Sequence, residues 1–354
     1  MLNIRDRYLG DGHSTFITFE AGPTHQGVES AKRLIRHAAQ AGADAIKFQF
    51  SDADYSVPDK SLVIEYKVLK DRNTGETETV RESMYDAVKR RVLKDDEWRE
   101  VKKCADEYNL KFFATINKEE TIGLLQEIGA DSIKIASGDI NHIPLIRSAA
   151  KSQMVIQLDT GNATIGEIEK AVDAIRLENN DRIIIHHCPS GYPAHLESIN
   201  LRIIPTLKRM FDAYPIGFSD HTPGWEMDIA AVALGANLIE KTITEDRTTR
   251  AIEHIMSIEP HEFKSFIGSI RFLEVALGKN RRLMHPEEIK KRVNVRRSAI
   301  LAEDVSKGTP LCKAKINFSR PGDGVSPDLF DMLKDAAFKY DLPRNHKLQL
   351  TDIE

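Results

Sequence analysis

Eight short apolar runs in the first 242 residues constrain the fold of this chain more than any other feature of its sequence. Each run is rich in Ile, Val, Phe and Leu. The runs show little of the alternation of apolar and polar residues that is typical of a strand with one solvent-exposed face. Near-continuous apolar strands of this kind are typical of parallel sheets that are buried on both faces. The runs cover residues 15–20, 45–50, 110–116, 131–137, 154–159, 182–188, 215–220 and 236–242.

Segments with helical periodicity separate the runs. Residues 28–41 place Val28, Ala31, Leu34, Ile35 and Ala38 on one face, and a glycine follows where a helix cap is expected. A second helix is predicted after Pro260 and ends before Gly278. Most steps from one run to the next are roughly 20 to 35 residues, the length of a strand plus a helix. We therefore predict a (β/α)8 TIM barrel over residues 1–280.

One long polar insert interrupts this spacing. It runs from Ser51 to Asp95 and contains the turn-rich stretch DRNTGETET. Inserts of this length inside a compact domain are usually functional, so we expect an active-site lid or a dimerisation loop.

The chain changes character after residue 280. Residues 279–297 hold eight Lys or Arg and one Pro, which indicates a solvated basic linker at 281–297, with a nucleic-acid or phosphate strip as the alternative. Residues 298–354 contain short apolar pieces between turn signals such as SRPGDG and predict a small, loop-rich domain. Because a domain of that size buries little apolar surface, we expect it to be stabilised by packing against the barrel or against another subunit.

The net charge limits the kinds of binding partner that are expected. The cysteines and the N-terminus indicate the cellular compartment. Fifty Lys and Arg against 54 Asp and Glu give a net charge of -4, which does not favour nucleic acid as a partner. Three cysteines without metal-knuckle spacing, and an N-terminus without a signal-peptide core, indicate a reduced, cytoplasmic protein. No apolar stretch reaches membrane-spanning length, so we expect no membrane partner.

Polar residues end the predicted strands, where the catalytic rim of a barrel lies. Three are lysines within otherwise apolar runs, Lys47, Lys134 and Lys241, and a desolvated ammonium group needs an anion beside it. We expect all three to converge on one bound anion, although each could instead snorkel outward. The neighbouring hydroxyls suit a phosphate or a carboxylate. Those hydroxyls are Thr115, Ser137 and Ser219.

The histidines near the same rim have several possible roles. His221 follows the seventh run and, with Glu20, could bind a divalent metal or act as an acid or base, or it could be structural. His186 and His187 are adjacent on one strand, so they must point to opposite faces. Cys188 carries no activating pattern and is expected to be a packing residue.

At these same positions the chain resembles the sialic acid synthase family, which condenses phosphoenolpyruvate with N-acetylmannosamine or a related amino sugar. The resemblance covers practically the whole chain. It implies a barrel enzyme and a C-terminal antifreeze-like (SAF) domain at 298–354 that covers the active site of the partner in a domain-swapped homodimer. The matching segments include EAGPTHQG, AGADAIKFQ, IKIASGD, HCPSGYPA, IGFSDHTPGWE, RRSAILAEDVSKGT and FSRPGDGVSP.

The resemblance also implies roles for residues of this chain. Glu20 handles a metal-bound water, and His221 is a ligand of a Mn2+ or Mg2+ ion that polarises the sugar aldehyde. The sugar is contacted by Gln49 and Tyr192, and its N-acyl group by Arg320 of the partner's SAF domain. The residues implied to hold phosphoenolpyruvate are Lys47, Thr115, Lys134, Ser137 and Ser219.

The sequence departs from the family pattern at several site positions. Thr242 stands where the family has its second metal-binding histidine, and a hydroxyl is a poor divalent ligand beside imidazole. Asp159 replaces the serine of the family's Ser-Thr-Gly, and Ser190 replaces an asparagine-like contact. The family's Pro-Asp-His reads Ile252-Glu253-His254, where Glu253 or His254 could supply the missing ligand. These changes indicate a divergent member with a different acceptor sugar.

We therefore predict a nonulosonic (sialic-type) acid synthase that condenses phosphoenolpyruvate with an N-acylated amino sugar and releases phosphate. Two alternatives stay open. One is a Schiff-base aldolase that uses Lys134 or Lys241 as its nucleophile. The other is a barrel without catalysis that binds a sugar phosphate.

Overall fold

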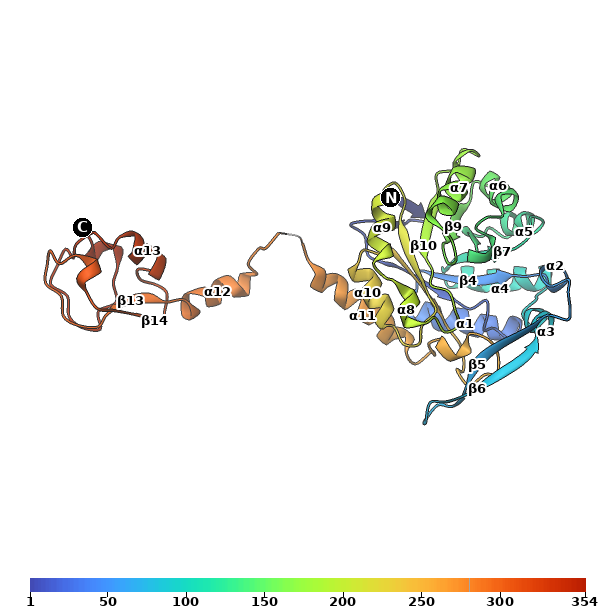
Figure 1. The fold of residues 1–354 in the computed structure, drawn as a ribbon, viewed down its shortest axis with the longest axis horizontal. Helices are drawn as coiled ribbons and strands as arrows, with labels where there is room; N and C mark the ends of the chain where they lie inside the picture. The colour runs from blue at the N-terminus through green and yellow to red at the C-terminus, as the bar shows by residue number, and fades with distance from the viewer. Residues whose placement is uncertain (280) are drawn as a thin grey trace. The chain divides into compact units, whose positions relative to one another are not determined.

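The computed structural model describes residues 1–279 and 281–354, which form two compact units, Met1–Gly278 and Lys279–Glu354 (Figure 1). The first unit is built on a closed barrel of eight parallel strands in the order β10-β11-β12-β3-β4-β7-β8-β9. All eight predicted runs are barrel strands, and β12 pairs with β3 to close the ring. This confirms the TIM barrel. The strands are β3 (Phe16–Glu20), β4 (Ala45–Phe50), β7 (Lys111–Ile116), β8 (Ser132–Ile135), β9 (Val155–Asp159), β10 (Ile183–His187), β11 (Ile216–Asp220) and β12 (Leu238–Thr242).

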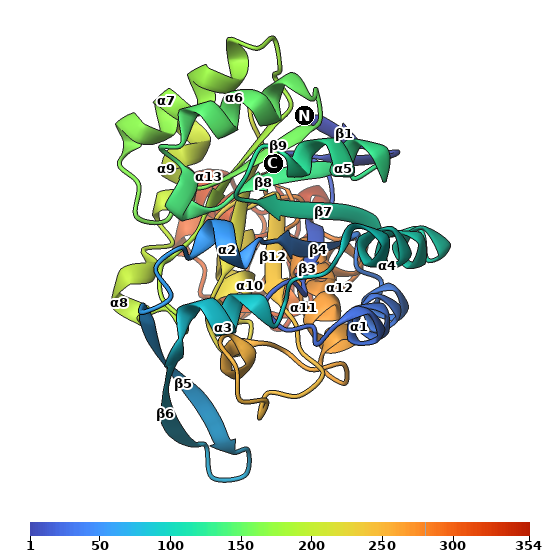
Figure 2. The same ribbon diagram turned by 90° about the vertical axis from the view of Figure 1, so that its right-hand side faces the viewer.

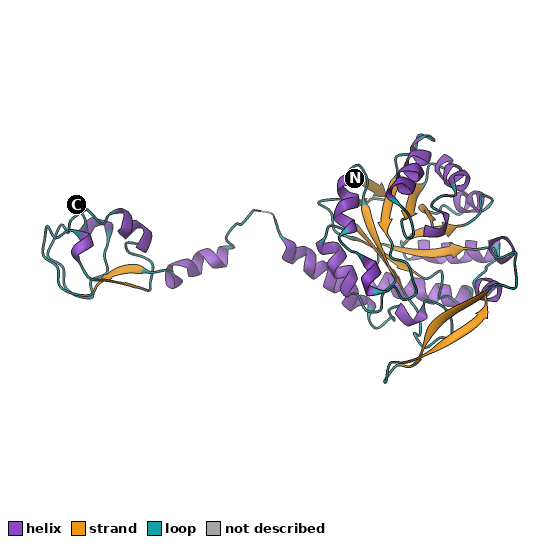
Figure 3. Ribbon diagram, in the orientation of Figure 1, coloured by secondary structure: helices purple, strands orange, loops and turns teal. Residues whose placement is uncertain are grey.

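Helices follow the strands and cover the outside of the barrel (Figure 3). The first, α1, has the bounds that its periodicity predicts and ends where Gly42 adopts the left-handed conformation at φ 90°. The main core fills the layer between strands and helices. The barrel helices are α1 (Val28–Ala41), α4 (Asp95–Glu107), α5 (Thr121–Glu127), α6 (Ile143–Lys151), α7 (Ile165–Arg176), α9 (Ile203–Met210), α10 (Glu226–Ala233) and α11 (Phe263–Leu277), with the short α8 (Leu196–Ile199) before α9. Within the described residues, none of these helices is long and apolar enough to cross a membrane.

A small N-terminal hairpin, which the apolar pattern of the sequence does not predict, packs against the end of the barrel where the strands begin. It consists of β1 (Leu2–Ile4) and β2 (Arg7–Leu9). Leu2, Ile4 and Leu9 form one buried cluster with residues near the starts of the strands, among them Phe16 and Phe113. The hairpin therefore closes the end of the barrel opposite the catalytic rim.

The polar insert is folded rather than irregular. It forms α2 (Ala53–Ser56), an antiparallel hairpin of β5 (Val63–Asp71) and β6 (Glu76–Ser83), and α3 (Met84–Lys89). The hairpin extends beside the loop that joins β12 to α11 (Figure 2). Its buried Tyr66, Val68 and Val80 pack with Ile252 of that loop. The insert therefore supports a loop at the rim of the barrel.

The second unit has its own core of Ala299, Leu301, Val305, Leu311 and their neighbours. It contains α12 (Pro286–Val295), the antiparallel pair β13 (Ser298–Leu301) and β14 (Ile316–Ser319), and α13 (Pro327–Met332). Within the segment expected to be a solvated basic linker, α12 begins at Pro286 behind the His285 cap and has no buried residues. The expected barrel boundary at residue 280 lies outside the described residues.

We predict that Phe113→Ala lowers the free energy of unfolding by about 3–5 kcal/mol, because it empties a site in the closed end of the barrel. Phe113 is fully buried, and its ring stacks on Phe16 at 5.7 Å between centroids. Phe272→Ala is the matched control, since this α11 side chain is 78% exposed. Urea unfolding measures both variants, and equal losses of stability would contradict this account of the barrel end.

Candidate active site

A polar cavity of about 230 Å³ lies at the carboxyl ends of the barrel strands. Eight of the ten residues singled out in the sequence line it, and Lys134 lies directly behind its wall. Arg320 belongs to the second unit. The eight lining residues are Glu20, Lys47, Gln49, Thr115, Ser137, Tyr192, Ser219 and His221.

Strand register brings the charged residues of this cavity together. Glu20 is paired with Lys47, and Ser219 is paired with Glu240 on β12. In-register residues of adjacent parallel strands point to the same side of the sheet. These side chains therefore meet inside the barrel, close to its open end.

One carboxylate holds two lysines in this buried network. Oε1 of Glu240 lies 2.8 Å from Nζ of Lys47 and 2.7 Å from Nζ of Lys134. Lys47 also pairs with Glu20, and Lys134 lies 2.9 Å from Oδ1 of Asp159. The hydroxyls of Thr115 and Ser219 each accept a hydrogen bond of 3.2 Å, from Lys47 and Lys134 respectively. The network contains two ammonium groups and three carboxyls.

Burial and charge set the protonation of this network. Burial alone would raise the pKa of Glu240, but Lys134 and Lys47 hold that pKa far below its usual range. Burial raises the pKa of Glu20, with a further contribution from Glu240, although Lys47 opposes the shift. The pKa of Lys47 stays well above its ordinary value because Glu20 and Glu240 outweigh the effect of burial. Glu240 is therefore a fixed anion, and Glu20 is the carboxyl better placed to exchange a proton.

Lys241 does not join this network, so the expectation that three lysines converge on one anion is wrong. Its Nζ pairs with Asp220, donates to the carbonyl of Thr222 at 2.6 Å and lies 3.6 Å from Asp228 of α10. Successive residues of a strand face opposite sides, so Lys241 must point away from the face that carries Glu240. It is a fully buried structural cation on the helix side of the barrel.

The paired histidines of β10 face opposite sides, as their adjacency predicts. His186 points into the barrel, where its Nε2 lies 2.8 Å from Oε1 of Gln157. His187 points toward α8, with its Nε2 2.5 Å from the carbonyl of Ile199. Neither lines the cavity. Cys188 does, but burial raises the pKa of its thiol to about 12, which leaves no thiolate for nucleophilic chemistry.

His221 has a defined tautomer. Its Nδ1 donates a hydrogen bond of 3.0 Å to the carbonyl of Pro189, so Nε2 carries the lone pair. Burial lowers the pKa of the imidazole, which favours the neutral form. The ring of Tyr192 lies against it at 4.7 Å between centroids. A neutral imidazole with a free Nε2 can accept a proton or bind a metal.

Two further carboxyls, those of Glu240 and Glu253, line the cavity. The sequence alone gives Glu240 no expected role, although its place one residue before Lys241 makes it face the barrel interior. Glu253, in the loop before η2 (His254–Met256), was considered only as a substitute metal ligand. It has a left-handed backbone (φ 74°) and a buried carboxyl. Burial raises the pKa of Glu253 to about 7.

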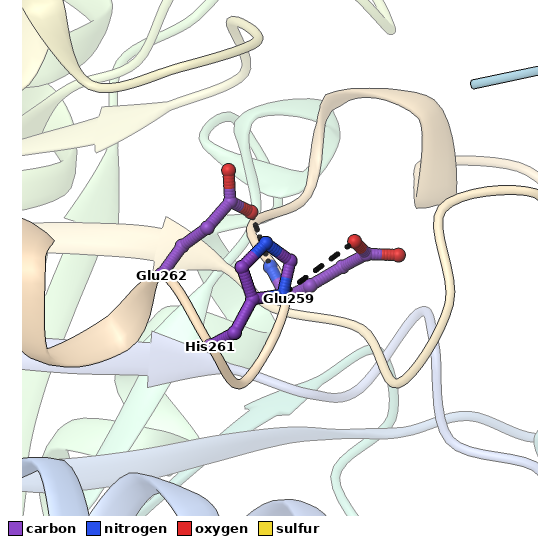
Figure 4. Close-up of side chains that lie close together, drawn as sticks. All are labelled: Glu259, His261 and Glu262. Carbon is purple, nitrogen blue, oxygen red and sulfur yellow. Dashed lines mark hydrogen bonds and ion pairs between the residues drawn. The ribbon is translucent and has the colours of Figure 1, made fainter. Parts of the chain in front are cut away.

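The cavity residues fit a divalent metal only in part. His221 offers one imidazole nitrogen, but the second expected ligand position is the buried hydroxyl of Thr242. In the part of the chain that the structure describes, three His or carboxylate donors lie within 4.8 Å of one another only at Glu259, His261 and Glu262 (Figure 4). These three do not line the cavity, and Glu259 and Glu262 already form ion pairs with Arg247. Among the described residues, His221 is the one histidine that lines the cavity.

Comparisons with known proteins agree with the resemblance. The chain is 32% identical to the N,N'-diacetyllegionaminic acid synthase of Legionella pneumophila, over 90% of this chain and 88% of the relative. It is 31% identical to human N-acetylneuraminate-9-phosphate synthase, over 86% and 83%. A crystal structure of N-acetylneuraminic acid synthetase from Leptospira borgpetersenii, in complex with citrate, matches with a TM-score of 0.71 and 32% identity, covering 82% of this chain and 94% of that one.

The NeuB family model matches residues 34–282, which include seven of the eight barrel strands. The family members found in the comparisons are enzymes of the sialic acid synthase class. Taken with the barrel and its polar rim, this match shows that the chain belongs to the NeuB family.

Proposed function

We propose that this protein is a nonulosonic acid synthase that joins phosphoenolpyruvate to an N-acylated amino sugar. In this reaction C3 of phosphoenolpyruvate attacks the sugar aldehyde, water adds at C2, and phosphate leaves by C–O cleavage. The observation that carries the proposal is the convergence of Lys47, three hydroxyls and the acid–base candidates Glu20 and His221 in one rim cavity. A cation with several hydroxyl donors suits a phosphate ester.

Each group has a role in this proposal. Lys47, Thr115, Ser137 and Ser219 hold phosphoenolpyruvate, and Lys134 supports Ser219 from behind the cavity wall. Gln49 and Tyr192 contact the sugar. Glu20 moves the proton of the attacking water. Gly22 lies so close to Gln49 that a Cβ there would stand 2.5 Å from the Gln49 backbone nitrogen, so a glycine allows the chain after Glu20 to pack against Gln49.

The partner and cofactor parts of the proposal come from the resemblance. Residues 298–354 would act as the SAF domain of a cytoplasmic homodimer, with Arg320 completing the partner's site. A divalent metal, Mn2+ or Mg2+, with His221 as its ligand, belongs to the proposal, and polarisation of the aldehyde is the chemistry it supplies when bound.

The structure weakens the aldolase alternative. Lys241 points away from the cavity, and Lys134 donates to Glu240 and Ser219 behind the cavity wall. A Schiff-base lysine needs a free amine that faces the substrate. The alternative of a non-catalytic sugar-phosphate binder is separated from the synthase by a direct assay. Incubation with phosphoenolpyruvate, a panel of amino sugars and Mn2+ should release phosphate and yield a nine-carbon acid by mass spectrometry. Binding without phosphate release would favour the non-catalytic barrel.

Glu20→Gln and His221→Ala should each lower kcat by about 10²-fold or more, because each removes a group expected to move or stabilise charge in the transition state. Phosphate release with the accepted amino sugar measures the effect, and circular dichroism checks the fold. Glu197→Gln is the matched control, since this carboxyl is exposed and does not line the cavity. Near wild-type turnover in either site variant would mean that the site is misassigned.

Asp159→Ser should lower the KM for phosphoenolpyruvate by roughly tenfold. The change removes a carboxylate from the wall of a cavity that must receive a phosphate, and it restores a hydroxyl donor. Lys134 keeps its pair with Glu240, so its charge stays compensated. Steady-state kinetics at fixed acceptor concentration give the KM, and an unchanged or higher value would show that Asp159 does not oppose the phosphate.

Glu253→Gln should flatten the pH dependence of stability. The pKa of Glu253 is about 7 in the folded chain against 4.5 as the ordinary value, so the folded state holds a proton that the unfolded chain releases. Stability therefore falls as pH rises from about 4.5 to about 7, by about 3 kcal/mol at most. Glutamine cannot ionise, so the variant should gain stability relative to the wild type between pH 5 and pH 8.

Urea unfolding at pH 5 and at pH 8 checks this prediction, with Glu197→Gln as the exposed control. Identical pH profiles for Glu253→Gln and the wild type would contradict the assignment of a buried, proton-holding carboxyl.

A further inference from the structure

Lys241, the buried lysine that faces away from the catalytic cavity, contacts the residues on both sides of His221. Lys241 is paired with Asp220 in the register of β12 and β11, so the two side chains point to the same, helix-facing side of the sheet. Its Nζ forms an ion pair with Asp220 and donates a hydrogen bond of 2.6 Å to the backbone carbonyl of Thr222. His221 is the residue between these two contacts. We call the contacts of Lys241 with Asp220 and Thr222 the lysine anchor.

Asp220 fixes the same turn of the chain from within. Its Oδ1 accepts hydrogen bonds from the backbone nitrogen of Thr222 at 3.1 Å and from the Thr222 hydroxyl at 2.8 Å. A carboxylate that bonds the backbone two residues later forms an Asx turn. Asp220 and Thr222 are buried, whereas His221 is half-buried and lines the catalytic cavity. The turn and the lysine anchor together leave the His221 backbone little freedom to move.

On the cavity side, His221 is bound to the loop that follows β10. Its Nδ1 donates to the carbonyl of Pro189 at 3.0 Å, and its own backbone carbonyl accepts a hydrogen bond of 2.9 Å from the backbone nitrogen of Ala194. The bond to Pro189 selects the tautomer in which Nε2 carries the lone pair. Both bonds depend on the position of the His221 backbone, which the lysine anchor fixes from the other side of the sheet.

The anchor contains a charged lysine. Burial would lower the pKa of Lys241, but Asp220 and Asp228 hold that pKa above its ordinary value. Asp228 lies further away, at 3.6 Å from Nζ, and neither of its carboxyl oxygens has a hydrogen-bond partner among the described residues. Burial, with a contribution from Asp220, raises the pKa of Asp228 well above its ordinary value, so this carboxyl keeps its proton near pH 7. The close contacts of the ammonium group are therefore those beside His221.

We propose that Lys241 is a positioning residue for His221. It holds Asp220 and the Thr222 carbonyl from the helix side of the sheet, and it thereby sets the place and the tautomer of an imidazole that acts on the opposite side. This inference rests on the proposed function for the part that His221 plays in turnover. Groups that orient an acid–base or metal-binding side chain typically change activity by about 10- to 100-fold, and a misplacement of about 1 Å has an effect of this size.

Nuclear magnetic resonance of the histidine side chains tests the position of the ring without any substrate. In protein with 15N-labelled histidine at pH 8, the signals of His221 are identified by their loss in His221→Ala. We expect the Nδ1–H tautomer in the wild type. In Lys241→Met we expect a mixture of the two tautomers, because the ring no longer stays within reach of the Pro189 carbonyl. An unchanged tautomer in the folded variant would overturn the proposal, whatever reaction the enzyme catalyses.

Turnover is the second measurement. Lys241→Met should lower kcat by about 10- to 100-fold. The KM for phosphoenolpyruvate should change less than about threefold, because Lys47 and Thr115 are held on β4 and β7 by contacts of their own. A kcat within about threefold of the wild type would contradict the positioning role.

Asp228→Asn is the matched control. This residue is fully buried, as Lys241 is, and it faces the same ammonium group, but it contacts neither neighbour of His221 through a hydrogen bond. Because an amide resembles a protonated carboxyl, we expect the wild-type tautomer and a change in kcat of less than about threefold. Equal losses in Asp228→Asn and Lys241→Met would mean that the cluster acts only by filling the helix side of the sheet, and the proposal would fail.

A double variant guards against simple loss of stability. Lys241→Met leaves Asp220 without its cation, which destabilises the fold. Lys241→Met combined with Asp220→Asn removes both charges and should recover much of the thermal unfolding midpoint. We expect its kcat to stay at least about tenfold low and its tautomers to stay mixed, since the Thr222 carbonyl still lacks the ammonium donor. Recovery of turnover together with stability would show that the ion pair serves the fold alone.

The two measurements separate this inference from the proposed function. Mixed tautomers in Lys241→Met, together with no phosphate release by the wild type from any acceptor, would support the positioning of His221 while the synthase reaction fails. Phosphate release by the wild type, together with an unchanged tautomer and kcat in Lys241→Met, would support the synthase and overturn the positioning role.

Discussion

The candidate site depends on one carboxylate that two buried ammonium groups share. Glu240 neutralises Lys47 and Lys134 from the middle of the barrel, and all three side chains are almost inaccessible to solvent. Removal of a single partner from such a group leaves an uncompensated buried charge, which costs about 3–5 kcal/mol. Lys47, which would bind phosphoenolpyruvate, is thus held in place before any ligand arrives. Its charge is also partly compensated, so an incoming phosphate must compete with Glu20 and Glu240.

The insert gives this barrel a wall on one side of its rim. Its hairpin packs on Ile252, and Arg72 at the end of β5 pairs with Asp246 and Glu259 on either side of the same loop. These contacts hold the segment in which Glu253 has its left-handed backbone. Without outside support, a non-glycine residue in that conformation is unfavourable by about 1 kcal/mol or more. The hairpin therefore supports the loop that carries Glu253.

Much of the architecture could be predicted from the sequence, because eight apolar runs at regular spacing leave few alternatives to a barrel. The rim positions followed from the strand ends, and eight of ten predicted residues line one cavity. The prediction failed where the direction of a side chain mattered. Lys241 was grouped with Lys47 and Lys134 by type, whereas its neighbour Glu240 has the inward position. The β1–β2 hairpin and the folded insert were missed because strands of three residues and polar hairpins give weak periodic signals.

The alternation along β12 makes the electrostatics of the barrel depend on a single residue step. Glu240 and Lys241 are sequence neighbours with opposite charges, and each has a complementary set of partners on its own side of the sheet. A slip of one position in one direction would place the Lys241 ammonium group between Lys47 and Lys134, and a slip in the other direction would place the Glu240 carboxylate against Asp220 and Asp228. Either slip brings like charges together in an interior that excludes water. The sequence therefore specifies the alignment of its last barrel strand by Coulomb repulsion as well as by hydrophobic burial, which penalises mispaired barrels during folding.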